Sequence, residues 1–341
     1  MLRYDFDQRV ALLTRLTPEQ LEEASFLDDR LLKPGVPHAD VALPLVVQTA
    51  LGLDRLCPLH FIFHTGHVGS TLTSRLLGVV PGVLSLREPF ILRQVAQAMD
   101  HAGVPDSRID PERMQRVFNA TLNLMRRGFP DTHTVLVKVA SVVGRIAPQL
   151  MAALPESRAI YLNVKPEAYV AGYLANPASL RDLLPTMEER IERLRREGLP
   201  DHLLTRPWTD GEQAALAWLA ESLAEQRAEA ALGDRLLRVD FDDTLADMEQ
   251  ALHRVLLHFS LPDAGETLQS MLHSPLRGRY SKAMDYEFSA AMRKGMLQEA
   301  ARRHADEMQR AEDWLDRVAA EHAGSRACLT RFPFPAGKWP A

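Results

Sequence analysis

The sequence LHFIFHTGHVGSTLTSR, residues 59–75, decides how the rest of the chain is interpreted. Residues 60–64 are aromatic, β-branched or histidine and predict a short buried strand. Residues 65–71 supply two glycines and several hydroxyl side chains, and residues 72–77 resume at helical spacing. A strand, a glycine turn and a helix together point backbone N–H groups and a helix N-terminus at an anion. We therefore expect a phosphate or sulfate group to bind at this loop.

The loop differs from the P-loop of nucleotide-hydrolysing enzymes. That motif, G-x-x-x-x-G-K-[ST], needs a lysine to reach the outer phosphates, and residues 65–71 contain none. The structural alternative is a glycine turn that leads into a core helix without binding a ligand. The rest of the chain has to distinguish the two interpretations.

The composition is that of an ordinary globular protein. The chain has 341 residues, 46% of them hydrophobic and 25% charged, which suffices for one large domain or two small ones. Its net charge of −5 provides no basic field for nucleic acid. The two cysteines form neither a disulfide framework nor a zinc spacing, and no apolar run is long enough to span a membrane. We expect a cytoplasmic protein that binds no metal.

The order of predicted elements indicates the fold class. Strands alternate with helices, which implies a parallel sheet covered on both faces. We predict an α/β, three-layer P-loop-type fold with a central parallel sheet of about five strands and helical N- and C-terminal additions. Residues 1–56 form a helical accessory segment, 57–295 the α/β domain with a helical insert at 173–234, and 296–341 a C-terminal helix and tail. The predicted strands are 60–64, 83–86, 134–139, 159–164 and 236–241.

The chain resembles the P-loop sulfotransferase superfamily, most closely a divergent and largely uncharacterised bacterial branch. Residues 69–72, GSTL, fall on that family's G-T-T-L, and His67 falls on its basic loop residue. Glu88, in the segment LREP, stands 21 residues after His67, where the family has a catalytic base. Residues 236–262 and the RYSK segment at 279–282 resemble two further family segments, so the likeness spans about residues 59–295.

The resemblance implies a sulfotransferase that uses PAPS (3′-phosphoadenosine 5′-phosphosulfate) as co-substrate and a small-molecule or peptide hydroxyl or amine as acceptor. Two positions depart from it. The family's arginine and serine that hold the 3′-phosphate are Val164 and Gly172 here, and the adjacent Lys165 offers only a point charge.

The candidate site combines the loop with three charged positions. Glu88 is the expected general base, and His67 is expected to stabilise charge on the leaving phosphate. Lys138 interrupts an apolar strand near its carboxyl end, so it either contacts a ligand or pairs with a core carboxylate. The expected cofactor-binding residues are Thr65, Gly66, His67, Val68, Gly69, Ser70, Thr71, Lys165, Arg279 and Lys282.

Three other interpretations remain. A P-loop kinase or nucleotidase would need the missing loop lysine. A non-catalytic module that binds a nucleotide or a partner on a degenerate sulfotransferase fold is favoured by Val164 and Gly172 and opposed by Glu88. Residues 240–245, DFDDTL, match the nucleophile motif of haloacid-dehalogenase-type phosphatases, but the partner motifs of that fold are missing downstream.

Overall fold

The computed structural model describes residues 3–33, 35–102, 110–262, 265–278 and 289–332. Its centre is a five-stranded sheet in the order β5-β6-β4-β7-β8, and every neighbouring pair is parallel. All five strands coincide with strands predicted from the sequence. They are β4 (Leu59–His64), β5 (Val83–Arg87), β6 (Thr134–Lys138), β7 (Ala159–Asn163) and β8 (Leu236–Asp240).

The strand order places the loop after β4 at a favourable position for a ligand. The chain runs from β4 to β5 and back to β6 on one side, then crosses to β7 and β8 on the other. Ligands of open α/β sheets bind beyond the carboxyl ends of the strands at such a reversal. The carboxyl end of β4 lies there, and residues 65–69 follow it directly.

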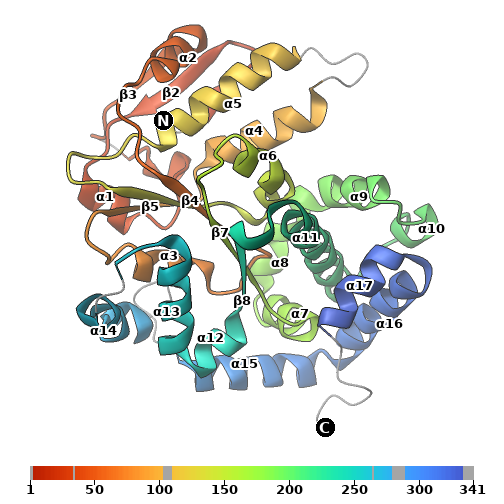
Figure 1. The fold of residues 1–341 in the computed structure, drawn as a ribbon. Helices are drawn as coiled ribbons and strands as arrows, with labels where there is room; N and C mark the ends of the chain where they lie inside the picture. Colours follow the sequence, from red (N-terminus) through yellow and green to blue (C-terminus); the bar gives the residue numbers. More distant parts are fainter. Residues whose placement is uncertain (1–2, 34, 103–109, 263–264, 279–288, 333–341) are drawn as a thin grey trace.

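Helices cover both faces of the sheet, which confirms the predicted three-layer arrangement (Figure 1). Alternate residues of β4 divide between the two cores: Ile62 packs with α3, α7, α11 and α13, whereas Phe61 and Phe63 pack with α4, α5 and α6. The bounds of these helices are α3 (Ser70–Leu77), α4 (Phe90–His101), α5 (Pro111–Met125), α6 (Ala147–Ala152), α7 (Pro166–Leu174), α11 (Asp210–Leu232) and α13 (Met248–Phe259).

The chain is helical between β7 and β8 and again over the described residues 289–332, where the structure has three helices in place of the single C-terminal helix that we predicted. Between β7 and β8 the chain is helical almost throughout, and α11 is its long buried helix. The C-terminal helices α15–α17 pack with α7 and α11. The remaining helices outside the N-terminal segment are α8 (Pro177–Leu183), α9 (Met187–Arg196), α10 (Asp201–Leu204), α12 (Phe241–Ala246), α14 (Gly265–Leu272), α15 (Ala290–Arg303), α16 (Ala305–Glu321) and α17 (Ala323–Arg331).

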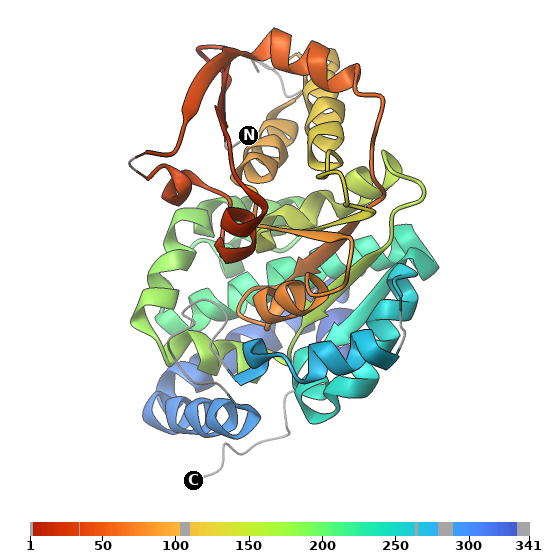
Figure 2. The ribbon, with the colours of Figure 1, turned by 90° about the vertical axis from the view of Figure 1, so that its left-hand side faces the viewer.

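The N-terminal segment differs from the helical segment that we predicted. It contains an antiparallel sheet of β1 (Arg3–Asp5), β2 (Val10–Thr14) and β3 (His38–Ala42), together with α1 (Pro18–Glu23) and α2 (Leu43–Leu51). This sheet lies beside α4 and α5 (Figure 2). The strands are short, and β2 pairs with β3 across more than twenty intervening residues. Pairing at that separation leaves no local pattern in the sequence.

Among the described residues, none of the helices combines the length and apolarity that crossing a bilayer requires.

Candidate active site

The loop between β4 and α3 has a backbone conformation that most amino acids adopt only rarely. Gly66, His67 and Gly69 have φ angles of 110°, 53° and 68°, in the left-handed region. A Cβ atom on Gly69 would lie 1.9 Å from the ring of Phe241, so this position accommodates glycine alone without a shift of that ring. The loop thus turns tightly into the start of α3.

The N-terminus of α3 carries unsatisfied donors. The first N–H groups of a helix have no acceptor within it, and those of Gly69–Leu72 make no hydrogen bond to another described residue. The Thr71 side chain is only 2% exposed, and its Oγ1 has no hydrogen-bond partner in the described part of the chain. A buried hydroxyl without a partner is costly. The loop and helix start therefore offer a cluster of donors suited to an oxyanion.

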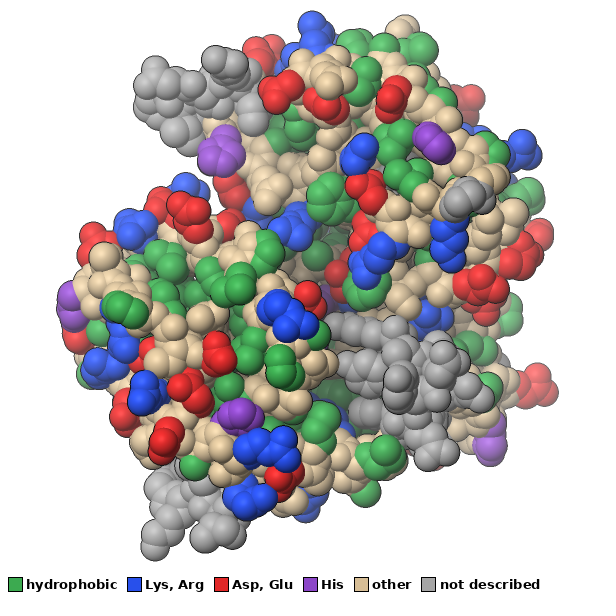
Figure 3. Space-filling view, turned by 180° about the vertical axis from the view of Figure 1, so that it is seen from behind, with side chains coloured by type: hydrophobic (Ala, Val, Ile, Leu, Met, Phe, Trp, Pro, Cys, Tyr) green, Lys and Arg blue, Asp and Glu red, His purple; other side chains and the backbone are tan. Residues whose placement is uncertain are grey.

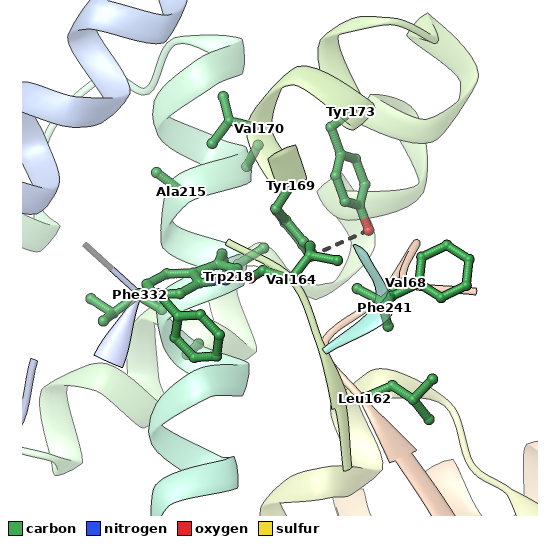
Figure 4. Packing of buried hydrophobic residues seen from close by; sticks show 14 of the residues in the cluster. Val68, Leu162, Val164, Tyr169, Val170, Tyr173, Ala215, Trp218, Phe241 and Phe332 are labelled. Carbon is green, nitrogen blue, oxygen red and sulfur yellow. Dashed lines mark hydrogen bonds between the residues drawn. The ribbon is translucent and has the colours of Figure 1, made fainter. Parts of the chain in front are cut away.

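Side chains from β7 and α7 hold the loop in place. Thr65 Oγ1 donates to Asn163 Oδ1 at 3.1 Å, and the Tyr169 hydroxyl donates to the Thr65 carbonyl at 3.1 Å. Tyr173 packs its ring against the His67 imidazole, with 4.4 Å between the ring centres. Burial raises the pKa of the Tyr173 hydroxyl to about 12, so it remains protonated near neutral pH. Figure 4 shows Tyr169 and Tyr173 side by side with a hydrogen bond between their hydroxyl groups.

A pocket of about 240 Å³ opens in front of the loop. Residues 67–72 form one wall, α7 contributes Gly172, and Phe241 and α15 close the other side. Among its described lining residues, the lysine and arginine side chains are Lys138 and Arg293. Arg293 is 8% exposed, stands over the ring of Phe241 and forms an ion pair of 3.3 Å with Asp242. The pocket thus combines helix N-terminal donors with two cations.

Glu88 and Lys138 meet at the carboxyl edge of the sheet. Lys138 is 1% exposed, and its ammonium donates to Glu88 Oε1. The Glu88 side chain is 21% exposed, and its Oε2 has no hydrogen bond within the described residues. Of the two roles expected for Lys138, pairing with a carboxylate is observed, and the residue also lines the loop pocket. His64 lies next to the pair, 4.0 Å from Glu88.

The N-terminal segment forms one wall beside this pair. The Arg87 guanidinium donates to the carbonyls of Leu21, Glu22 and Ala24, and the Leu27 N–H donates to the Arg87 carbonyl at 2.8 Å. These bonds hold Phe26 with its ring centre 6.0 Å from the Lys138 ammonium. Residues 21–27 therefore lie beside the pair of Glu88 and Lys138. This contact joins segments that are distant in sequence, so the hydrophobic periodicity of the sequence does not reveal it.

The residues expected at the 3′-phosphate site do not bring a described cationic side chain to the loop pocket. Val164 is completely buried in the core between Tyr169 and Trp218 (Figure 4). Lys165 is exposed and is not among the residues that line the pocket. Gly172 lines the pocket but contributes no donor from a side chain. Arg279 and Lys282 lie outside the described residues.

Arg293 is a site residue that the sequence pattern alone did not single out, although it stands in a locally basic segment. Its signal was present in the spacing, because Leu297 and Ala300 follow at helical intervals and share the packed face of α15. A charged residue on such a face is either paired or directed at a ligand.

The phosphatase-like motif has a structural explanation. The Asp240 carboxylate accepts hydrogen bonds from the N–H groups of Asp242 and Asp243, at 2.7 and 3.1 Å, and so caps α12. Within the described residues, no group of three or more His, Cys, Asp or Glu side chains is arranged to hold a metal ion.

Comparisons with known proteins give similarity to solved structures only, since no protein-family model and no curated protein matches the chain. A sulfotransferase domain from the curacin biosynthetic pathway aligns at 12% identity and a TM-score of 0.43, covering 83% of this chain and all of that domain. The sulfotransferase domain of the Synechococcus PCC 7002 olefin synthase aligns at 15% identity and 0.41, covering 84% and 98% of the two chains.

Mouse sulfotransferase SULT7A1, crystallised with PAP, aligns at 10% identity and a TM-score of 0.41, covering 84% of this chain and 93% of that one. Likeness at these TM-scores and identities assigns neither a family nor an activity to the chain. The function therefore has to follow from the residues of its own site.

Proposed function

We propose that the protein transfers a sulfuryl group from PAPS to a hydroxyl or amine acceptor. The observation that carries the proposal is the position of the buried, unpartnered Thr71 hydroxyl at the start of α3, in a pocket that also contains Lys138 and Arg293. Such a donor cluster suits the oxygens of a phosphosulfate. The resemblance of residues 67–72 and of Glu88 to sulfotransferase motifs supports the same assignment.

The fit to the nucleotide is good at one end. The 5′-phosphosulfate suits the N–H groups of residues 69–72 and the Thr71 hydroxyl. PAPS would supply the activated sulfuryl group, whose bond to the phosphate oxygen breaks as its sulfur bonds to the acceptor. Neither Val164 nor Gly172 can hold a 3′-phosphate through its side chain, so Arg293 is the described pocket cation best suited to a second anionic group.

The roles of the residues follow from their placement. Glu88 would accept the acceptor's proton, because its Oε2 is free of hydrogen bonds to described residues and its side chain is partly exposed. Lys138 orients Glu88 through Oε1 and places a positive charge between the base and the loop pocket. That charge and His67 would stabilise the negative charge that develops on the leaving phosphate.

The test is a calorimetric titration of the purified protein with 3′-phosphoadenosine 5′-phosphate (PAP), the product nucleotide, beside 5′-AMP and ATP with magnesium. Tight binding of PAP that weakens when the 3′-phosphate is absent is the expected result, and it would justify a screen for the acceptor with labelled PAPS. A preference for ATP with magnesium, or no nucleotide binding, would overturn the proposal.

A further inference from the structure

The pocket in front of the loop contains a second group of polar side chains, which comes from the start of α8. Asn176 and Ser179 line this pocket together with Lys138 and residues 67–72. Asn176 caps α8, and Ser179 stands in the first turn of the helix. Side chains at these two positions are neighbours, because a helix brings residues three apart onto the same face. The pocket therefore offers a ligand polar groups from the insert as well as from the loop.

The Ser179 hydroxyl has no partner within the described part of the chain. The residue is 5% exposed, its N–H donates to the Asn176 carbonyl at 2.9 Å, and its Oγ makes no hydrogen bond to a described residue. A hydroxyl in a helix often bonds the carbonyl four residues earlier, as Thr121 does with Val117 at 2.7 Å. Ser179 makes no such bond. A buried hydroxyl without a partner is costly, and a hydrogen bond from a ligand would remove that cost.

The Asn176 carboxamide is oriented by its capping bond. Its Oδ1 accepts the Ala178 N–H at 2.9 Å, which is the side-chain cap of α8. Its Nδ2 makes no hydrogen bond to a described residue. Because Oδ1 is occupied, the group that remains for a ligand is the N–H donor. The Ser179 hydroxyl beside it can donate or accept, so the two side chains together suit an uncharged oxygen.

The charges of the pocket indicate which other ligand groups fit. Its described lining residues include the cations Lys138 and Arg293 and no Asp or Glu. An ammonium group on the ligand would meet positive charge without a carboxylate to offset it. Anionic groups suit the loop donors and the two cations, whereas Asn176 and Ser179 carry no charge. Lys and Arg side chains also lie on both sides of the hollow near the centre of the face in Figure 3.

We infer that Asn176 and Ser179 bind a second, uncharged oxygen of the acceptor, a hydroxyl or an amide carbonyl on the same molecule as the hydroxyl that receives the sulfuryl group. The acceptor role rests on the proposed sulfuryl transfer, whereas binding of a neutral oxygen at α8 is measurable by itself. The acceptor is then a neutral polyol or hydroxy amide rather than a simple alcohol or an amine. The two residues determine specificity and take no part in proton transfer.

The test compares diols with simple alcohols by ligand-observed NMR titration of the full chain, with and without PAP. The probes run from 1,4-butanediol to 1,8-octanediol, each beside the 1-alkanol of the same length. Without a polar partner in the pocket the alkanol would bind more tightly, because burying the second hydroxyl of the diol is unfavourable. With Asn176 and Ser179 as partners, the diol should bind about threefold to tenfold more tightly at one or more chain lengths.

Two variants and a control assign the preference to α8. Ser179→Ala should remove the preference for the diol and leave the affinity for PAP unaltered. Asn176→Asp keeps the capping acceptor and replaces the amide donor by a negative charge, so it should favour the ω-amino alcohol of the same length over the diol. The unaltered protein should bind that amino alcohol less tightly than the diol. The matched control is Ser270→Ala, which removes a hydroxyl from an exposed position on α14 and should keep the preference.

Tighter or equal binding of the alkanol at every length, including no detectable binding of either probe, would overturn the inference. A diol preference that survives Ser179→Ala would also overturn it, and so would a loss of PAP affinity in that variant, since the hydroxyl would then serve the nucleotide. The PAP titration separates the two proposals: failure of PAP to bind while the diol preference persists would reject sulfuryl transfer and leave the neutral site at α8. Thermal melting of each variant verifies that it is folded.

Discussion

Glu88 and Lys138 are joined twice. The Glu88 N–H donates to the Lys138 carbonyl at 2.6 Å, and the Lys138 ammonium donates to Glu88 Oε1. The two residues stand at the carboxyl ends of the paired strands β5 and β6. Glu88 has a φ angle of 46°, a left-handed conformation that is uncommon for a residue with a side chain. The two hydrogen bonds to Lys138 hold the carboxylate at the edge of the sheet despite the energetic cost of this backbone conformation.

Replacing Glu88 by Gln should lower turnover by about 10² to 10⁴, because the amide cannot accept the acceptor's proton. PAP affinity, measured by calorimetry, should stay within a factor of about two to three, since Glu88 is not among the residues that line the loop pocket. Unchanged turnover would exclude Glu88 as the base.

The two members of the ion pair should contribute unequally to stability. Lys138→Met replaces a buried cation by an apolar side chain of similar length and leaves the partly exposed Glu88 hydrated, so the free energy of unfolding should change by less than about 1.5 kcal/mol. Glu88→Gln leaves the buried ammonium with a neutral partner and should cost about 1–3 kcal/mol. Urea unfolding of both variants measures the difference, and a larger loss in Lys138→Met would contradict this account.

Gly69→Ala should abolish nucleotide binding and destabilise the protein by about 2–4 kcal/mol, because it combines left-handed backbone strain with a clash against Phe241. Gly198→Ala is the matched control: its φ angle is 94°, yet a Cβ atom there meets nothing within 4 Å. The control should show a loss of about 1–2 kcal/mol from strain alone and unaltered PAP binding. Equal losses in the two variants would show that the Phe241 contact is unimportant.

Arg293→Gln should weaken PAP binding by about tenfold or more, because the variant removes a buried pocket cation from an anionic ligand. Its partner Asp242 is partly exposed and can be hydrated, so the fold should persist. Lys294→Gln removes the same charge from the adjacent exposed position and should leave the affinity unchanged. Equal affinities for the two variants would place the anion elsewhere.

His60 should make the fold sensitive to mild acid. Its Nδ1 accepts the Arg158 N–H at 3.0 Å, and burial lowers the pKa of His60 from 6.5 to about 4. Between these values the unfolded chain binds the extra proton, so stability is full above pH 6.5 and falls as the pH decreases toward 4. From pH 7 to pH 5 the loss from this group is about 2 kcal/mol. Between pH 7 and pH 5, the His60→Asn variant should therefore lose about 2 kcal/mol less unfolding free energy than the unaltered protein, as measured by urea unfolding. Equal losses in the two proteins would show that His60 is not the group responsible.

The sequence by itself determined the five parallel strands, the glycine loop between the first strand of the sheet and its helix, and the helices of the insert. These depend on local patterns: apolar runs in residues 134–139, glycines at 66 and 69, and helical spacing through residues 211–232. Those patterns reflect short-range backbone preferences and the burial of one face of a helix or strand, both of which can be recognised from residues close together in sequence. The pairing of Lys138 was among the alternatives that its position in an apolar strand suggested.

Only the tertiary structure decided which distant groups share the site. The pairing of Lys138 with Glu88, Phe26 against Lys138, Arg293 in the loop pocket and the antiparallel pairing of β2 with β3 join residues separated by tens to hundreds of positions. Such long-range contacts depend on how the layers pack, so the residues adjacent in sequence do not indicate them. Local sequence patterns therefore predicted the parallel sheet and the loop, whereas the packing of the whole chain determined which charged residues lie beside them.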